Sequence, residues 1–211
     1  IESGVIKNAN GVIGLELFGS TEGSENSYLS GILLRDDTTT EIYYPHIASD
    51  STWWTGIVAY NPSSSPCTLT ITPITATGNP LTSQTLLING KGKYIGTAAT
   101  LNLPENTAWL KIEGSSAITG FELFGTNNGK QLAGYTGVGI TGKEGIFAKL
   151  EQNGGWTGIA LVNIEDTLAT VTLTAYDDSG NSVATTTLNL SGYEKVVSMA
   201  ESLFNGQGIS G

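Results

Sequence analysis

The sequence predicts an all-β protein of two tandem repeats, each a β-sandwich or barrel of seven to eight mostly antiparallel strands and about 100 residues. Three observations support this prediction. Blocks of sequence recur in the same order in both halves of the chain. Apolar residues alternate with threonine in several segments, as in a strand with one wet face. Short segments rich in glycine and asparagine separate these strands, as hairpin turns do.

The repeat defines the organisation of the whole chain. "VIGLELFGSTEG" at residues 12–23 returns as "ITGFELFGTNNG" at 118–129, and "WWTGIVAYN" at 53–61 returns as "GWTGIALVN" at 155–163. We therefore predict one β-repeat in residues 1–105 and a second in residues 106–211. Two alternatives stay open: a circularly shifted boundary, with the two ends completing one another, and excision from a longer array of such units.

The individual strands follow from alternation. "CTLTITPI" at 67–74 and "ATVTLTAY" at 169–176 place apolar residues at every second position. "TATGN" at 75–79 and "DDSGN" at 177–181 follow them, and their Gly and Asn residues accept the positive φ of a hairpin turn. Only "SMAESLF" at 198–204 has the pattern of a helical turn.

Composition excludes several function classes. The chain has 19 acidic and 9 basic residues and a net charge of −10, so it lacks the clustered Lys and Arg that bind nucleic acid. No run of 18 apolar residues occurs, so we expect no membrane insertion. The single cysteine, Cys67, and the single histidine, His46, exclude an intrachain disulfide and a zinc site built from Cys and His. Cys67 lies on an alternating strand and is expected in the core.

The strand–turn–strand pattern "WTGIALVNIEDTLATVTLTAYDDSGN" at 156–181, with its counterpart at 54–79, resembles the immunoglobulin-like or fibronectin-like β-sandwich repeats of secreted bacterial proteins. The resemblance implies a secreted or cell-surface location, extracellular or periplasmic. It also implies a non-catalytic structural or adhesion module within a larger protein, with a protein or glycan as its surface partner. The resemblance assigns no catalytic residues to this chain.

The tryptophans suggest an alternative function. Trp54 and Trp156 occupy the same place in the two copies, each two residues before a glycine, and are expected to pack over that glycine. Trp53 has only Gly155 as its counterpart and would point to the opposite face of the strand. Such rings stack on sugars and anchor protein partners. The candidate binding residues of the first copy are Trp53, Tyr43, Tyr44, His46 and Tyr60. The alternative prediction is therefore a carbohydrate-binding module.

Two glutamates lie in strongly apolar surroundings, Glu16 in "LELF" and Glu122 in "FELF". Burial would raise the pKa of either carboxyl group, and two carboxylates are what glycoside hydrolysis requires. However, the two residues occupy the same position in both copies, which is what a repeated structural hydrogen bond would produce. We find no nucleophile elbow and no phosphate-binding loop. The sequence therefore predicts no enzymatic activity.

Calcium is the one cofactor that the sequence leaves open, since clustered carboxylates bind hard cations. The candidate ligands are Asp177 and Asp178 in "DDSGN" and Asp36 and Asp37 in "RDDTTTE". The counterpart of "DDSGN" in the first copy, "TATGN", has no carboxylate. The shared Gly and Asn explain the turn without a metal, so we expect no metal site and solvated aspartates at a hairpin tip. The identity of the ligand and the oligomeric state stay open.

Overall fold

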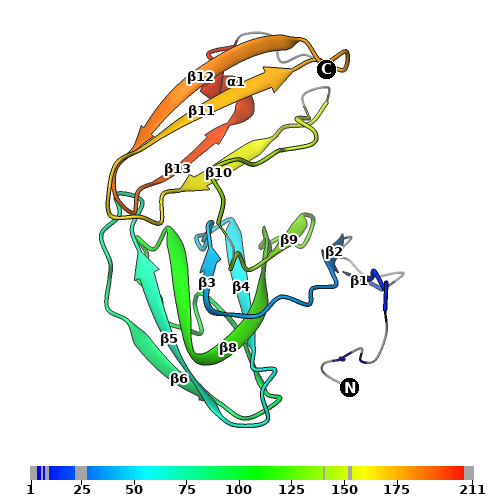
Figure 1. Ribbon diagram of the computed structural model, residues 1–211, viewed down its shortest axis with the longest axis vertical. Helices are drawn as coiled ribbons and strands as arrows, with labels where there is room; N and C mark the ends of the chain where they lie inside the picture. The colour runs from blue at the N-terminus through cyan, green and yellow to red at the C-terminus, as the bar shows by residue number, and fades with distance from the viewer. Residues whose placement is uncertain are drawn as a thin grey trace.

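A computed structural model describes residues 4–5, 7, 10–21, 28–139, 141–151 and 154–206, and the prediction of an all-β protein is confirmed (Figure 1). Within these residues the elements are β1 (Leu15–Gly19), β2 (Leu29–Leu33), β3 (Thr39–Tyr44), β4 (Trp53–Tyr60), β5 (Cys67–Ile74), β6 (Gln84–Ile88), β7 (Lys93–Thr97), β8 (Trp109–Thr126), β9 (Leu132–Thr136), β10 (Gly158–Val162), β11 (Ala169–Tyr176), β12 (Ser182–Leu190), β13 (Lys195–Met199) and α1 (Ala200–Leu203). All strand pairs are antiparallel. No helix among the described residues is long and apolar enough to cross a membrane.

The long strand β8, of 18 residues, organises the largest sheet. Its first part pairs with β5 and β3, and its second part pairs with β4 and β9. β6 pairs with β5 and β7 pairs with β4, which extends the sheet to the order β6-β5-β8-β4-β7. Figure 1 shows β8 curving strongly between its two parts, so that the sheet curls into a half-barrel. The half-barrel therefore has an inner face that one strand lines from end to end.

The inner face of the half-barrel holds the main core. Alternation along β4 buries Thr55, Ile57 and Ala59 while Trp54, Val58 and Tyr60 point outward. The core cluster comprises Ile42, Tyr44, Ile47, Ile57, Ala59, Cys67, Leu69, Ile71, Ile88, Ala98, Leu101, Leu110, Ile112 and Ile118. Cys67 is fully buried there as a free thiol, as its alternating position predicts.

The second half of the chain is built differently. β10 pairs only with β13, and β11 pairs only with β12, which leaves two separate two-stranded sheets among the described strands. A smaller core of Ile159, Ala175, Ala184, Ala200, Leu203 and Phe204 lies between them. In Figure 1 these strands and α1 lie beyond one end of the half-barrel.

The strand count differs from the prediction in the second half. Residues 106–211 contain β8 to β13, six described strands where seven or eight are predicted. β8 begins just beyond the predicted boundary after residue 105, yet it pairs with β3, β4 and β5 of the first half. The sheet that the first half begins is thus completed by the second, and the division into two equal repeats stays a prediction.

Aligned positions in the two halves nevertheless make the same local contacts. The Asn61 side chain donates to Ser65 O at 2.7 Å and accepts from the Ser63 N–H at 3.0 Å, and Asn163 makes the same two bonds with Thr167 O and the Glu165 N–H. A Cβ added to Gly56 would meet the Trp54 ring at 3.1 Å, and one added to Gly158 would meet the Trp156 ring at 3.2 Å. The rings therefore lie over the following glycines, as predicted.

Both predicted hairpin turns are present. Gly78 has φ +85° and Gly180 has φ +84°, a backbone conformation that L side chains rarely adopt. The Asp177 N–H donates to Asn181 O at 2.9 Å, and the Thr75 N–H donates to Asn79 O at 3.0 Å. The segment predicted as a helical turn contains α1.

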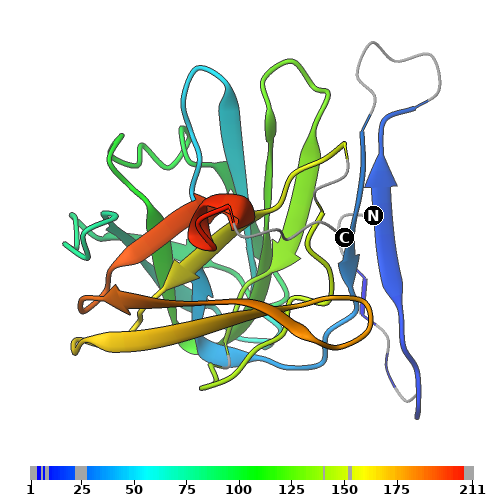
Figure 2. The ribbon, with the colours of Figure 1, turned by 90° about the horizontal axis from the view of Figure 1, so that it is seen from above.

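The N-terminal hairpin stands apart from the half-barrel. Among the described strands β1 pairs only with β2, and Figure 2 shows β1 on the outside of the molecule, with β2 between it and β9. Ile32 is buried and Phe18 stacks on Phe121 at a centroid distance of 6.5 Å, so one face of the hairpin rests on the half-barrel. The other face exposes Leu15, Leu17, Leu29 and Leu33.

We expect Asn61→Ala to lower the free energy of unfolding by on the order of 2 kcal/mol, because Ser65 O, Asn89 O and the Ser63 N–H lose a buried partner. Urea denaturation monitored by circular dichroism measures the change. Asn79→Ala, at an exposed turn, is the control and should cost much less. Equal losses in the two variants would contradict this role of Asn61.

Candidate functional site

A buried polar cluster around Glu122 is the most perturbed group of titratable residues that the structure describes. Glu122 faces the inside of the half-barrel from β8, between Ile57 of β4 and Tyr135 of β9, and is fully buried. The Tyr135 hydroxyl donates to Glu122 Oε2 at 2.7 Å. Glu122 Oε1 has no hydrogen-bond partner among the described residues. Burial raises the pKa of this carboxyl group to about 8.

Lys195 reaches the same region from the second half of the chain. Its Nζ lies 3.0 Å from His46 Nδ1 and donates to Ala108 O at 2.5 Å. Burial lowers the pKa of Lys195 to about 8, although the charge of Glu122 opposes that shift. The pKa of His46 falls to about 4, through burial and the charge of Lys195. At neutral pH the imidazole is therefore neutral, and its Nδ1 accepts a hydrogen bond from the ammonium group.

The loop after β3 links the two parts of this cluster. The His46 N–H donates to the Tyr135 hydroxyl oxygen at 3.1 Å, and that hydroxyl is the donor to Glu122. The chain of contacts thus runs from Glu122 through Tyr135 and His46 to Lys195. We call these four residues the junction cluster, because they connect the half-barrel with β13.

Backbone contacts reinforce the same connection. The Lys195 N–H donates to Ala76 O at 2.9 Å, and the Trp109 indole donates to Tyr193 O at 3.1 Å. Trp109 is buried, and Gly78 lies so close to Gly192 O that a Cβ at Gly78 would meet that atom at 2.4 Å. The β5–β6 turn, the start of β8 and the start of β13 therefore form one packed interface between the two halves.

The two glutamates that the sequence singled out have different environments. Glu122 is fully buried, whereas Glu16, at the aligned position on β1, is exposed. They lie on separate sheets. The raised pKa expected for a carboxyl group in apolar surroundings occurs at Glu122. The hydrogen bond of Glu122 is not repeated at Glu16. Tyr135 pairs with Glu122, whereas the residue that pairs with Glu16 is Ile32, which has no hydroxyl group.

The predicted aromatic binding residues are not gathered on one exposed surface. Trp53 and His46 both pack against Phe124, with centroid distances of 6.2 Å and 5.6 Å. Tyr44 is fully buried, and its hydroxyl donates to Val58 O at 2.8 Å, so its ring is not open to a sugar. Tyr60 is half-buried on the outer face of β4.

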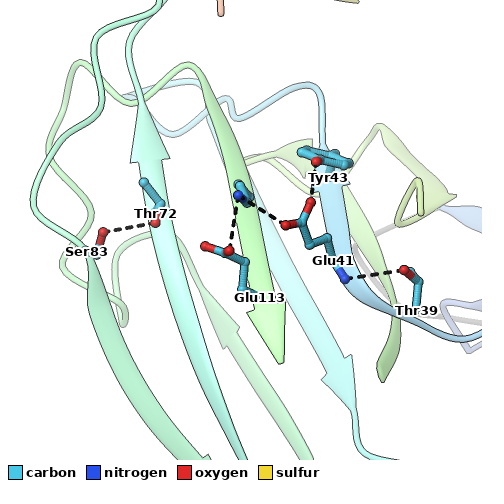
Figure 3. A network of polar contacts seen from close by, with 7 residues as sticks. Thr39, Glu41, Tyr43, Thr72, Ser83 and Glu113 are labelled. Carbon is cyan, nitrogen blue, oxygen red and sulfur yellow. Dashed lines mark hydrogen bonds and ion pairs between the residues drawn. The ribbon is translucent and has the colours of Figure 1, made fainter. Parts of the chain in front are cut away.

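Tyr43 belongs to a polar network on the outside of the sheet (Figure 3). Its hydroxyl donates to Glu41 Oε2 at 2.7 Å, and Lys111 Nζ lies 3.4 Å from Glu41 Oε1 and 3.2 Å from Glu113 Oε1. Burial and the bond to Glu41 raise the pKa of Tyr43. The network joins β3 to β8, which favours a structural role for Tyr43.

A groove on the outer side of the half-barrel has a different aromatic lining. Its volume is about 380 Å³, and its lining residues are Phe18, Gly19, Tyr28, Trp54, Leu123, Thr126, Asn127, Gly129, Gln131 and Leu132. Trp54, expected only to pack over its glycine, therefore also lines a concave surface. None of the five predicted binding residues lies in this groove.

The aspartates proposed as calcium ligands make other contacts. Asp177 Oδ1 accepts from the Ser179 and Asn181 N–H groups at 2.9 Å and 2.8 Å, which stabilises the hairpin turn. Asp37 forms an ion pair with Arg35. Asp36 and Asp178 are exposed. The described part of the chain contains no group of three or more His, Cys, Asp or Glu side chains placed to hold a metal ion.

Sequence reasoning missed Tyr135 and Lys195. Tyr135 follows the repeated "FELFG" block, where the two copies no longer match, so it carried no signal. Lys195 aligns with Lys93, which is half-buried on β7, and only the packing of the two halves distinguishes them.

Comparison with known proteins adds little. No protein-family model matches the chain, and no curated protein matches it. A solved structure described as Thermotoga maritima 1070 is similar with a TM-score of 0.40 and 13% sequence identity, over 47% of this chain and 92% of that chain. This likeness is too weak to assign a fold or a function.

The junction cluster predicts an unusual dependence of stability on pH. The pKa of Glu122 is about 8 in the folded state and 4.5 when unperturbed, so its stabilising contribution is full below pH 4.5 and is lost as the pH rises through 8. The lowered pKa of His46 makes stability rise with pH only between about 4 and 6.5, and the lowered pKa of Lys195 makes stability rise with pH only between about 8 and 10.5.

Between pH 6.5 and 8 we therefore expect the free energy of unfolding to fall by on the order of 1–2 kcal/mol, because Glu122 is ionised in the unfolded chain but still mostly protonated in the folded protein. Chemical denaturation at several pH values measures this slope. Glu122→Gln keeps an acceptor for Tyr135 and should flatten it, whereas Glu16→Gln should leave it unchanged. A slope that persists in Glu122→Gln would contradict the assignment.

Proposed function

We propose that the protein is a non-catalytic, extracellular structural and adhesion module that holds its two halves in a fixed arrangement. The observation that supports it is the junction cluster. Lys195, 8% exposed, contacts both the backbone of the half-barrel and His46. Burying an ammonium group costs free energy unless its hydrogen bonds are made. The cluster therefore favours one relative placement of the halves over all others.

The environment of Glu122 supports a structural role over a catalytic one. A general acid or base must come within hydrogen-bond reach of the proton that it transfers. Glu122 is fully buried, and it lines neither the groove beside Trp54 nor the cavity between Ile47 and Thr107. Its raised pKa is accounted for by burial inside the half-barrel. The perturbed groups of the cluster thus serve the packing of the two halves.

The structural role predicts that the two halves unfold as one unit. Lys195→Ala leaves Ala108 O and His46 Nδ1 without their donor. We expect a loss on the order of 1–2 kcal/mol, since removing the buried ammonium group also removes its desolvation cost. In scanning calorimetry the single transition of the wild type should separate into two.

The matched control is Lys93→Ala, at the aligned position on β7, which should change stability by less than about 0.5 kcal/mol and keep one transition. Two independent transitions in the wild type would contradict a module with rigidly joined halves.

Carbohydrate binding is a second candidate, and the groove is the observation that favours it. Its volume of about 380 Å³ lies within the usual range of ligand sites. Phe18, Tyr28 and Trp54 supply aromatic surface, and the amides of Asn127 and Gln131 supply hydrogen-bonding groups. Such a combination suits a neutral polar ligand such as a sugar chain. A neutral ligand is also not repelled by the net charge of −10 that the protein carries.

If the groove binds glycans, titration with soluble polysaccharides should produce a saturable change in tryptophan fluorescence. Trp54→Ala should weaken binding by at least about tenfold, since a buried aromatic anchor carries much of the binding energy. Trp53→Ala, which alters the neighbouring residue on the opposite face, is the control and should retain most of the affinity. Loss of binding in Trp53→Ala alone would move the site to the inner face.

A further inference from the structure

The N-terminal hairpin and the second half of the chain each lack a strand neighbour that their counterparts have. β4 is paired on both sides, by β7 and by β8. Within the described part of the chain β10, aligned with β4, is paired only by β13. Conversely, the second part of β8 pairs with β4 and β9, whereas the aligned strand β1 has β2 as its only partner among the residues that the structure describes. In the half-barrel the strands that correspond to these two free edges, β4 and the second part of β8, pair with each other.

We propose that β1 of one molecule pairs with β10 of a second copy of this chain and thereby completes its second half. The β4–β8 register carries over position by position. Trp54 opposes Gly125, Ile57 opposes Glu122 and Val58 opposes Phe121. In the aligned sequence Trp156 then opposes Gly19, Ile159 opposes Glu16, and Ala160 opposes Leu15.

Glycine placement supports this register. A Cβ added to Gly125 would meet the indole of Trp54 at 3.1 Å, so the ring needs a glycine opposite it. At the aligned position β1 has Gly19, and the ring that would cover it is Trp156. Trp156 is 56% exposed, whereas Trp54 is half-buried. The segment just before β10 therefore presents an exposed ring, and β1 presents the glycine that such a ring covers.

The apolar surface of the hairpin agrees with an intermolecular partner. Leu15 is 57% exposed and Leu17 is 62% exposed. Phe121 and Leu123, at the aligned positions of β8, are half-buried, and the Phe18 ring of β1 stacks on Phe121. An edge strand with an unpaired backbone and apolar side chains is a template for pairing with another chain. β1 has both properties.

The charged residues Glu16 and Lys149 also support the proposed pairing. Glu16 would enter the second half at the position that Glu122 occupies in the first. Lys149, which now pairs with Glu151 at 2.7 Å, aligns with His46 of the junction cluster. The second half thus carries a cation at the sequence position that aligns with His46. That arrangement offsets part of the cost of burying Glu16.

The position of the hairpin indicates a second copy rather than closure within one chain. Phe18 and Ile32 hold it on the first half of its own molecule, and Arg35 Nη1 donates to Thr136 Oγ1 at 3.2 Å. Its free edge faces outward, and β10 does not lie beside it in Figures 1 and 2. Pairing of β1 with β10 joins two different surfaces, so it produces either a reciprocal dimer or a head-to-tail ring or chain of copies.

Cysteine cross-linking between two single variants tests this pairing. In a Cys67→Ala background, which has the residue found at the aligned position 169, Leu15→Cys and Ala160→Cys are made as separate proteins. Oxidation of their mixture should produce a disulfide-linked heterodimer on a non-reducing gel. Leu15→Cys mixed with Leu161→Cys, shifted by one residue to the opposite face, is the control and should cross-link far less.

Two further variants test whether strand pairing drives the cross-link. Leu17→Asp places a charge at the proposed contact and should slow cross-linking by about tenfold. Leu33→Asp is the matched control, because Leu33 is equally exposed and aligns with the polar Thr136 of β9. Circular dichroism of both variants shows that the monomer still folds.

Three results would overturn the proposal. They are no heterodimer in the mixture, equal cross-linking of the shifted pair, and closure of a Leu15→Cys/Ala160→Cys double variant within one molecule. The proposal rests on the structural role proposed above. Cross-linking is scored independently of cooperative unfolding, however, so the failure of one is distinguishable from the failure of the other.

Discussion

The pairing of β8 along both edges is the constraint on which the rest of the structure depends. Four strands hydrogen-bond to it, two along each of its parts. Without it, the strand pairs β4–β7 and β5–β6 would be separate ribbons, and isolated two-stranded ribbons are marginal in water. The second half shows that arrangement directly, because no described strand lies between the pairs β10–β13 and β11–β12 and joins them.

The curl of β8 also creates the environment of the junction cluster. By wrapping the sheet, it directs Glu122 into an interior where the carboxyl group has one donor, the Tyr135 hydroxyl, and a raised pKa. Lys195 then approaches from outside the half-barrel and contacts His46 and Ala108 O. Groups that would be unremarkable on a surface become coupled, because low dielectric strengthens their interaction and penalises each charge.

The two halves show how similar sequences reach different structures. Trp54 and Trp156 each lie over the glycine two residues further along the chain, and Asn61 and Asn163 make the same loop contacts. These features are local, so they form wherever the sequence recurs. Burial of Trp54 and exposure of Trp156 are not local, because they depend on whether a strand equivalent to β8 lies alongside.

The sequence by itself determined the all-β class, the hairpin turns at Gly78 and Gly180, the core position of Cys67 and the packing of tryptophan over glycine. Each follows from alternation or from backbone conformation within a few residues. Only the tertiary structure decided that Tyr44 is buried, that Trp54 lines the groove and that Lys195 meets His46. These outcomes depend on which distant strands pair and how the sheet curls. The period of a strand specifies two faces but not which of them becomes the interior.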